Sequence, residues 1–218
     1  MTTYSQISDL MVATEKTQNL KKESNHYPAW QLTDRQICDL ELLLNGGFSP
    51  LDGFMGKADY NSVLKNMRLD NGALWPMPIT LDITEEFASK IKDVEKITLR
   101  DQEGFTLAIL TVTDIWEPNK DEEAQMVYGT TDLKHPAVNY LKNKSNKMAV
   151  GGKLEGISLP HHYDYQKNRH TPEELRSIFI QNGWDKIVAF QTRNPLHRAH
   201  VEMTMRASKD LNANLLIH

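Results

Sequence analysis

The spacing of hydrophobic positions divides the chain into helices and strands. Between residues 32 and 46 apolar side chains recur every three or four positions, which predicts a helix with Thr33 as its N-cap and Asn45-Gly46-Gly47 at its end. A second helix is predicted over 57–69, after a turn-rich loop. The same spacing predicts two shorter helices over 121–129 and 135–144.

A different pattern follows between Trp75 and Trp116, where Ile, Val, Thr and Leu are concentrated in short runs. It predicts antiparallel strands, with an Asp-Gln-Glu-Gly turn between the last two, over 75–83, 96–101 and 105–116. A further strand is predicted over 147–159. This strand contains Gly151-Gly152-Lys153 but lacks the upstream glycine spacing and the Ser or Thr of a phosphate-binding loop, which favours a bend or turn.

The last third of the chain has an alternating helix and strand pattern. Residues 159–175 are polar and contain two prolines, which predicts a linker that ends in the helix start Thr171-Pro172-Glu173-Glu174. Beyond it the pattern predicts a helix, a strand, a second helix and a final strand over 172–182, 186–190, 195–211 and 214–218. Strand, helix and strand in so few residues predict parallel strands joined by a right-handed crossover.

Composition places the chain among soluble globular proteins, with 39% hydrophobic and 25% charged residues among 218. Its apolar runs are far shorter than the roughly 20 residues that cross a bilayer. Its N-terminal segment is polar, which argues against secretion. The single cysteine, Cys38, excludes an intrachain disulfide framework and favours a reducing, cytoplasmic location. The helical apolar pattern around Cys38 predicts that this thiol is buried.

The net charge of −4 is distributed unevenly. Residues 186–218 contain five Lys or Arg and two acidic residues, so residues 1–185 carry the remaining net charge of −7. An acidic body with a small basic end fits a local anion site better than a general nucleic-acid surface. We therefore expect no nucleic-acid partner and no membrane.

The candidate chemistry lies in the polar decapeptide Gln191–His200, which follows a predicted strand. Ligands of open α/β sheets bind beyond the carboxyl ends of the strands. If Asn194 is the N-cap and Pro195 the first helical residue, the free amides of the helix N-terminus and the guanidinium of Arg193 suit a phosphate or a sulfate. Gln191 and Thr192 add neutral hydrogen-bond donors, and His197 and His200 add two imidazoles.

Simpler interpretations of each feature remain open. An Asn-Pro pair is also ordinary helix initiation, and His197 and His200 lack a third partner for zinc. Three further histidines, His161, His162 and His170, lie in the predicted linker. They have no nearby Cys or acid at ligand spacing, so no protein-bound metal is predicted there. It is the joint presence of the donors at one strand–helix junction that favours an anion site.

The decapeptide QTRNPLHRAH resembles the active-site signature of the ATP sulfurylase (sulfate adenylyltransferase) family. Further segments resemble the same family in the same order, from about residue 20 onward: LTDRQICDLELLLNGGFSPLDGFM, ALWPMPITLDI, VYGTTDLKHPAVNYL, GGKLEGI and RHTPEELRSIF. The resemblance implies an enzyme of sulfate assimilation in which sulfate attacks MgATP to give adenosine 5′-phosphosulfate and pyrophosphate. Mg²⁺ would arrive with ATP.

The resemblance also implies residue roles. Gln191 and Arg193 would bind sulfate, Thr192, Arg193 and Asn194 would be the catalytic trio, and the phosphates of ATP would contact Gln191, Asn194, His197 and His200. ATP and sulfate are thus the expected substrates, and the full-length enzyme is expected to be a homo-oligomer.

The fold implied is α/β overall. Residues 1–167 would form a mixed α+β, PUA-like β-barrel domain, and residues 168–218 the first βαβ unit of a truncated, Rossmann-like nucleotidyltransferase domain. Family members continue to a Gly-Arg-Asp-His segment, so the 218 residues alone are expected to be inactive. Two alternatives are a non-catalytic binding or structural module, and a different His-x-x-His adenylyltransferase.

Overall fold

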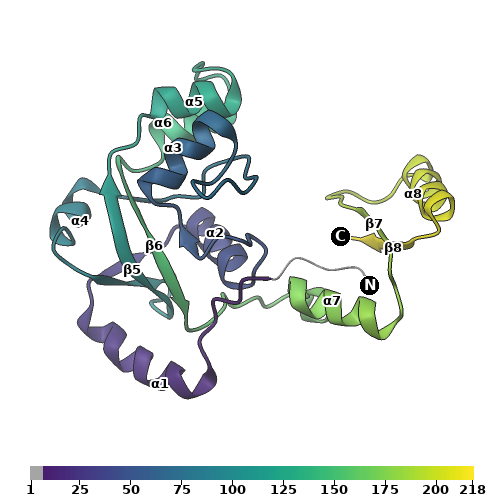
Figure 1. Cartoon of the computed structure of the whole chain (residues 1–218), viewed down its shortest axis with the longest axis horizontal. Coiled ribbons are helices and arrows are strands. Elements are labelled where there is room, and N and C mark those ends of the chain that lie inside the picture. The colour runs from purple at the N-terminus through teal and green to yellow at the C-terminus, as the bar shows by residue number, and fades with distance from the viewer. Residues whose placement is uncertain (1–6) are drawn as a thin grey trace. The chain divides into compact units, whose positions relative to one another are not determined.

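The computed structural model describes residues 7–218, which divide into two compact units, 7–166 and 167–218. Figure 1 shows the helices and strands of both units in chain order. We describe each unit by itself.

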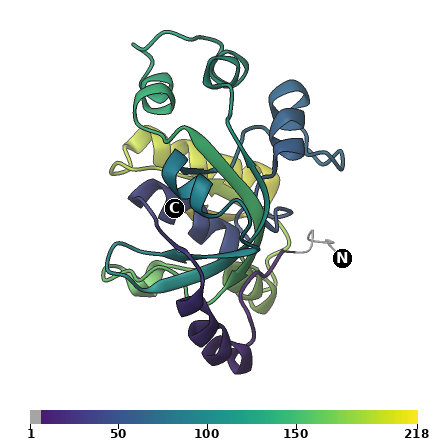
Figure 2. The same ribbon diagram turned by 90° about the vertical axis from the view of Figure 1, so that its left-hand side faces the viewer.

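The first unit is built on a six-stranded sheet in the order β1-β4-β5-β6-β2, with β3 also paired to β6. Only β1 and β4 pair in parallel, and the other pairs are antiparallel. The long strands β5 and β6 lie side by side (Figures 1 and 2). The strand bounds are β1 Ala29–Gln31, β2 Gly53–Phe54, β3 Leu81–Ile83, β4 Lys96–Arg100, β5 Thr106–Trp116 and β6 Met148–Gly156.

The turn between β4 and β5 forms where the sequence predicts it. The Asp101 carboxylate accepts the amide hydrogens of Glu103 and Phe105 through Oδ1 at 3.0 and 2.8 Å, and Gly104 adopts a φ of +91° that favours glycine. The predicted antiparallel hairpin is therefore confirmed. The predicted strand over 75–83 is strand only at its end, as β3, and it pairs with β6 instead.

The glycine pair Gly151-Gly152 lies inside β6, where backbones approach closely. A Cβ on Gly152 would meet the Thr111 carbonyl oxygen at 2.1 Å, and one on Gly151 would meet the Met55 carbonyl oxygen at 2.4 Å. The β5–β6 register shifts beside this pair, between Val112 and Asp114. Glycine is needed at both positions for close strand packing, and the predicted bend falls at this irregularity.

Six α-helices of the described first unit surround the sheet: α1 Thr14–Glu23, α2 Asp34–Leu44, α3 Lys57–Asn66, α4 Glu85–Lys90, α5 Lys120–Tyr128 and α6 Pro136–Asn143, with a 3₁₀ turn, η1, at Ser24–His26. The four predicted helices, α2, α3, α5 and α6, are confirmed. Thr33 caps α2, since its hydroxyl accepts the Gln36 amide hydrogen while the Gln36 side-chain oxygen accepts the Thr33 amide hydrogen at 3.0 Å. Short or weakly apolar elements such as α1, α4, β1 and β2 were not predicted.

The core of the first unit lies between α2 and the sheet. Leu40, Leu43 and Leu44 of α2 are fully buried against strand residues such as Leu81 and Leu99. The prediction that Cys38 is buried was wrong, because Cys38 lies on the exposed side of α2. An apolar pattern identified the buried stripe of the helix, and Cys38 lies outside that stripe.

The second unit contains a 3₁₀ turn, η2 (Gln166–Asn168), followed by α7 (Pro172–Gln181), β7 (Ile187–Phe190), α8 (Arg198–Leu211) and β8 (Asn214–Ile217). Strands β7 and β8 pair in parallel, from Ile187 opposite Asn214 to Phe190 opposite Ile217, which confirms the predicted strand–helix–strand arrangement. Thr171 caps α7, as the sequence predicts, and the structure adds a capping box with Glu174.

The predicted start of α8 was wrong. Its N-cap is His197, and Asn194-Pro195 lies outside the helix. The Thr192 hydroxyl accepts the Asn194 amide hydrogen and donates to the Asn194 carbonyl oxygen, both at 3.1 Å. This tight local turn uses Asn194 before the helix begins, so an Asn-Pro pair that suits an N-cap forms a turn here instead.

Candidate anion site at the β7–α8 junction

The decapeptide Gln191–His200 connects the carboxyl end of β7 to the N-terminus of α8. Backbone hydrogen bonds fix its first residues against the end of β8: the Thr192 amide donates to the His218 carbonyl at 2.8 Å, and the His218 amide donates to the Phe190 carbonyl at 3.1 Å. The loop therefore lies at the edge where both parallel strands end. This is the place at which open α/β sheets bind ligands.

Most of the candidate side chains are open to solvent. Gln191, Arg193, Asn194 and His197 are exposed, while Thr192 and His200 are half-buried. Within the described part of the chain, the Arg193 guanidinium makes no hydrogen bond or ion pair. Because its N–H groups have no partner there, they are available to bind an oxyanion through two parallel hydrogen bonds.

The two histidines lie side by side despite the later start of the helix. Their ring centroids are 5.3 Å apart, and the Phe190 ring lies 5.6 Å from the His200 ring. The His197 amide donates to Nδ1 of His200 at 3.3 Å. Together with the first amides of the 14-residue helix α8, the outer nitrogens of these rings can supply further donors at the junction. The junction can thus bind an anion with several oxygens.

The described residues contain no group of three or more His, Cys, Asp or Glu side chains placed to hold a metal ion. The decapeptide itself contains no acidic residue. His162, one of the loop histidines, instead contacts the Glu41 carboxylate through Nε2, at 2.8 and 3.0 Å from its two oxygens. A sequence pattern gives no signal for this contact, because 121 positions separate the two residues.

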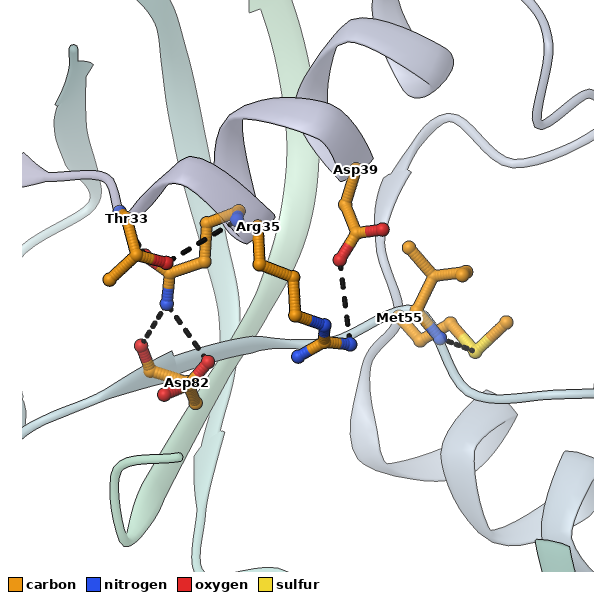
Figure 3. Close-up of polar contacts among 7 residues, drawn as sticks. Thr33, Arg35, Asp39, Met55 and Asp82 are labelled. Carbon is orange, nitrogen blue, oxygen red and sulfur yellow. Dashed lines mark hydrogen bonds and ion pairs between the residues drawn. The ribbon is translucent and has the colours of Figure 1, made fainter. Parts of the chain in front are cut away.

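A second concentration of polar groups lies in the first unit, around Asp82 of β3 (Figure 3). The Gln36 amide group donates to the Asp82 carbonyl at 2.7 Å and to Oδ1 at 2.9 Å. Oδ2 accepts hydrogen bonds from the backbone and side chain of Asn146 at 2.7 and 3.0 Å. Both carboxylate oxygens therefore accept hydrogen bonds, and Asp82 joins α2, β3 and the segment just before β6.

Next to this network is a cavity of about 220 Å³ between β3, α5 and α6. Its wall includes Glu123, which accepts a 2.7 Å hydrogen bond from the Tyr60 hydroxyl, and Lys120, which donates to the Ser145 carbonyl at 2.8 Å. Burial raises the pKa of Glu123, although the Tyr60 hydrogen bond and nearby cations oppose that shift. Burial also lowers the pKa of Lys120. No pattern in the sequence predicts this cluster, because Tyr60 and Glu123 lie 63 positions apart.

A larger hollow of about 760 Å³ lies along the first unit, between the β4–β5 turn and residues 158–163. It contains none of the residues predicted to bind substrate, and its wall is formed by loop residues, the start of β5 and residues of α1 and α2. No helix of the described residues is long and apolar enough to span a bilayer.

The matches to protein-family models agree with the division of the structure into two compact units. A PUA-like domain model matches residues 2–159, and an ATP-sulfurylase model matches residues 166–218, which include the whole decapeptide. The chain belongs to the family of proteins with a PUA-like domain, and its residues 166–218 match the ATP-sulfurylase model. The resemblance to ATP sulfurylases is confirmed, and the fold is mixed α/β with a PUA-like domain.

Three proteins that are similar to the chain are called sulfate adenylyltransferase. The protein of Eremothecium gossypii is 51% identical over 94% of this chain and 41% of its own length. Those of Kluyveromyces lactis and Saccharomyces cerevisiae are 53% and 52% identical over 90% of this chain, and over 39% and 38% of their own lengths. The chain thus spans about two fifths of the length of these relatives.

A solved structure is also similar to the chain. It is described as a hexameric APS kinase from Thiobacillus denitrificans, and it superposes with a TM-score of 0.80 at 35% identity. The match covers 98% of this chain and 38% of that one.

Proposed function

We propose that this chain is part of a sulfate adenylyltransferase, with residues 1–167 as its N-terminal PUA-like domain and 168–218 as the opening of its catalytic domain. The observation that carries the proposal is the β7–α8 junction, where Arg193, which has no hydrogen-bond or ion-pair partner among residues 7–218, and two adjacent imidazoles lie at the N-terminus of α8. About half of the residues are identical to those of relatives named for this reaction.

The reaction brings two anions together. A sulfate oxygen attacks the α-phosphorus of ATP, the bond to the β-phosphate breaks, and pyrophosphate leaves as adenosine 5′-phosphosulfate forms. Sulfate is a weak nucleophile, so the protein has to position both substrates and stabilise the added charge. Fixed donors at one loop supply both effects without a covalent intermediate.

We assign sulfate to Gln191 and Arg193, and the catalytic role to Thr192, Arg193 and Asn194. The phosphates of ATP would contact Gln191, Asn194, His197 and His200. The Thr192 hydroxyl is already used in the turn with Asn194, so its contribution is to shape the loop that presents Arg193. Mg²⁺ would be held by the phosphates of ATP, since the decapeptide has no carboxylate with which to bind it.

The finer architecture is part of the same proposal. The open hydrogen-bonded path from β1 to β2 would curve as a PUA-like barrel, and β7–α8–β8 would begin a Rossmann-like sheet. We place the enzyme in the cytoplasm, which suits its single cysteine, Cys38. A homo-oligomer is supported by the hexameric state in the description of the similar structure.

The test uses a full-length enzyme that contains this chain. Arg193→Ala should reduce sulfate-dependent pyrophosphate release by roughly 10²–10³, the usual loss for one preorganised charge-stabilising donor. The matched control is Arg206→Ala, because Arg206 pairs with Glu202 on α8 and should leave turnover nearly unchanged. Near-normal turnover of Arg193→Ala, or failure of molybdate to compete with sulfate, would contradict the proposal.

A further inference from the structure

The contact between His197 and His200 indicates which nitrogen of the neutral His200 ring carries the proton. A backbone N–H can only donate, and the His197 amide points to Nδ1 of His200 at 3.3 Å. Nδ1 must therefore offer its lone pair, and the neutral His200 ring carries its hydrogen on Nε2. The second nitrogen remains a hydrogen-bond donor.

The His200 ring is also held in place by its neighbours. Its ring centroid lies 5.6 Å from that of Phe190, with 39° between the ring planes, and 5.3 Å from that of His197, with 31° between the planes. Phe190 is the last residue of β7 and pairs in register with Ile217, so strand pairing fixes its backbone. The buried Thr204 hydroxyl donates to the His200 carbonyl at 2.9 Å and anchors the first turn of α8.

We propose that Phe190 is a positioning residue and that, with the His197 amide, it holds His200 as a neutral Nε2–H donor to a phosphate oxygen of the nucleotide. This inference rests on the function proposed above. Under this proposal, the charge and the directed hydrogen bond come from different groups. Positive charge comes from Arg193 and the helix N-terminus, whereas His200 supplies a directed hydrogen bond without charge.

The proton position can be measured directly on the 218-residue chain. Long-range ¹H–¹⁵N NMR at a pH where the imidazoles are neutral should show Nδ1 of His200 as fully unprotonated and Nε2 as fully protonated. An exposed histidine such as His170 should average between the two tautomers and serves as the reference. An averaged or reversed pattern for His200 would overturn the inference, whatever the activity of the enzyme.

Two substitutions in a full-length enzyme then separate a neutral donor from a cation. His200→Gln keeps both an acceptor for the His197 amide and a neutral donor, so it should retain more of the kcat/KM for ATP than a cationic replacement does. His200→Lys adds charge but has no acceptor, and a loss of roughly tenfold or more is expected. The opposite order would show that charge is what His200 supplies, and equal activity of both would show that it supplies neither.

The positioning role of Phe190 has its own test. Phe190→Ala should raise the KM for ATP by roughly tenfold and move the His200 ring nitrogens away from the single-tautomer pattern, whereas Phe190→Tyr, which keeps the ring, should restore both. Unchanged nitrogen shifts in a folded Phe190→Ala would refute that role. The Arg193→Ala enzyme separates the two proposals: if it is inactive while the His200 results fail, only this inference falls.

Discussion

The two units of the chain use their polar side chains in opposite ways. In the first unit, Gln36 and Asn146 both donate hydrogen bonds to the Asp82 carboxylate. The buried Glu123 accepts a hydrogen bond from Tyr60. In the second unit, the side chains of Gln191 and Arg193 extend from a loop into solvent. Polar groups that satisfy one another stabilise a fold, and polar groups left open can bind a ligand. The difference separates a unit whose polar groups stabilise its fold from the unit that we propose carries the chemistry.

The largest effect should come from the core of the first unit. Leu43→Ala removes a side chain with no exposed surface and should reduce the free energy of unfolding by about 2–5 kcal/mol, since it loses apolar burial and leaves a cavity. Leu42→Ala is the control on the same helix, because Leu42 is 39% exposed and should cost far less. Urea titration monitored by tryptophan fluorescence measures both. Equal losses would contradict the packing of α2.

The saturated carboxylate of Asp82 should rank second. Asp82→Ala leaves the Gln36 and Asn146 donors without their acceptor, and about 2–3 kcal/mol of unfolding free energy should be lost. Asp52 is a useful comparison, since it is exposed and paired only with Lys153, so Asp52→Ala should change stability by less than about 1 kcal/mol. If the two variants unfold at the same urea concentration, Asp82 does not join these elements as described.

The two helix caps allow the units to be compared by the same chemical change. Thr33→Ala and Thr171→Ala each remove a hydroxyl that accepts an amide hydrogen in a capping box, and each should cost about 1 kcal/mol. Hydrogen exchange should show the effect of Thr33→Ala on the amides of α2, and that of Thr171→Ala on the amides of α7. Serine at either position keeps the hydroxyl and is the control. A loss of protection in both helices from one substitution would show that their stabilities are coupled.

Local chemistry explains which features were predictable. The N-caps Thr33 and Thr171 and the turn at Gly104 depend on residues near one another in the chain, so the sequence predicts them, and the alternation of strand, helix and strand predicts the parallel pair β7–β8. The start of α8 was misplaced because Thr192 competes for Asn194, and two local signals pointed to different structures. The Tyr60–Glu123 and His162–Glu41 contacts join distant segments, and no local pattern encodes them.

The candidate site was predictable in its composition but not in its register. The decapeptide and its strand-end position were evident, and the family resemblance supplied substrates and roles. The contact of the His197 amide with Nδ1 of His200 depends on a helix that begins at Arg198, three residues later than the sequence suggested. Phe190 was part of an apolar strand run, and only the folded geometry brings its ring against His200.

The smallest expected effect concerns Glu123, whose side chain is nearly buried in the first unit. Burial raises the pKa of this carboxyl above the ordinary value of 4.5 that it regains on unfolding. The folded protein therefore binds this proton more tightly, and unfolding free energy should fall as pH rises from about 4.5 through the folded-state pKa. Glu123→Gln keeps an acceptor for Tyr60 but carries no charge, so its stability relative to the wild type should improve across that range. Glu122→Gln, at an exposed neighbour, should follow the wild type. Urea titrations at several pH values measure the difference. If the unfolding free energies of Glu123→Gln and the wild type change in parallel with pH, burial does not raise the pKa of this carboxyl.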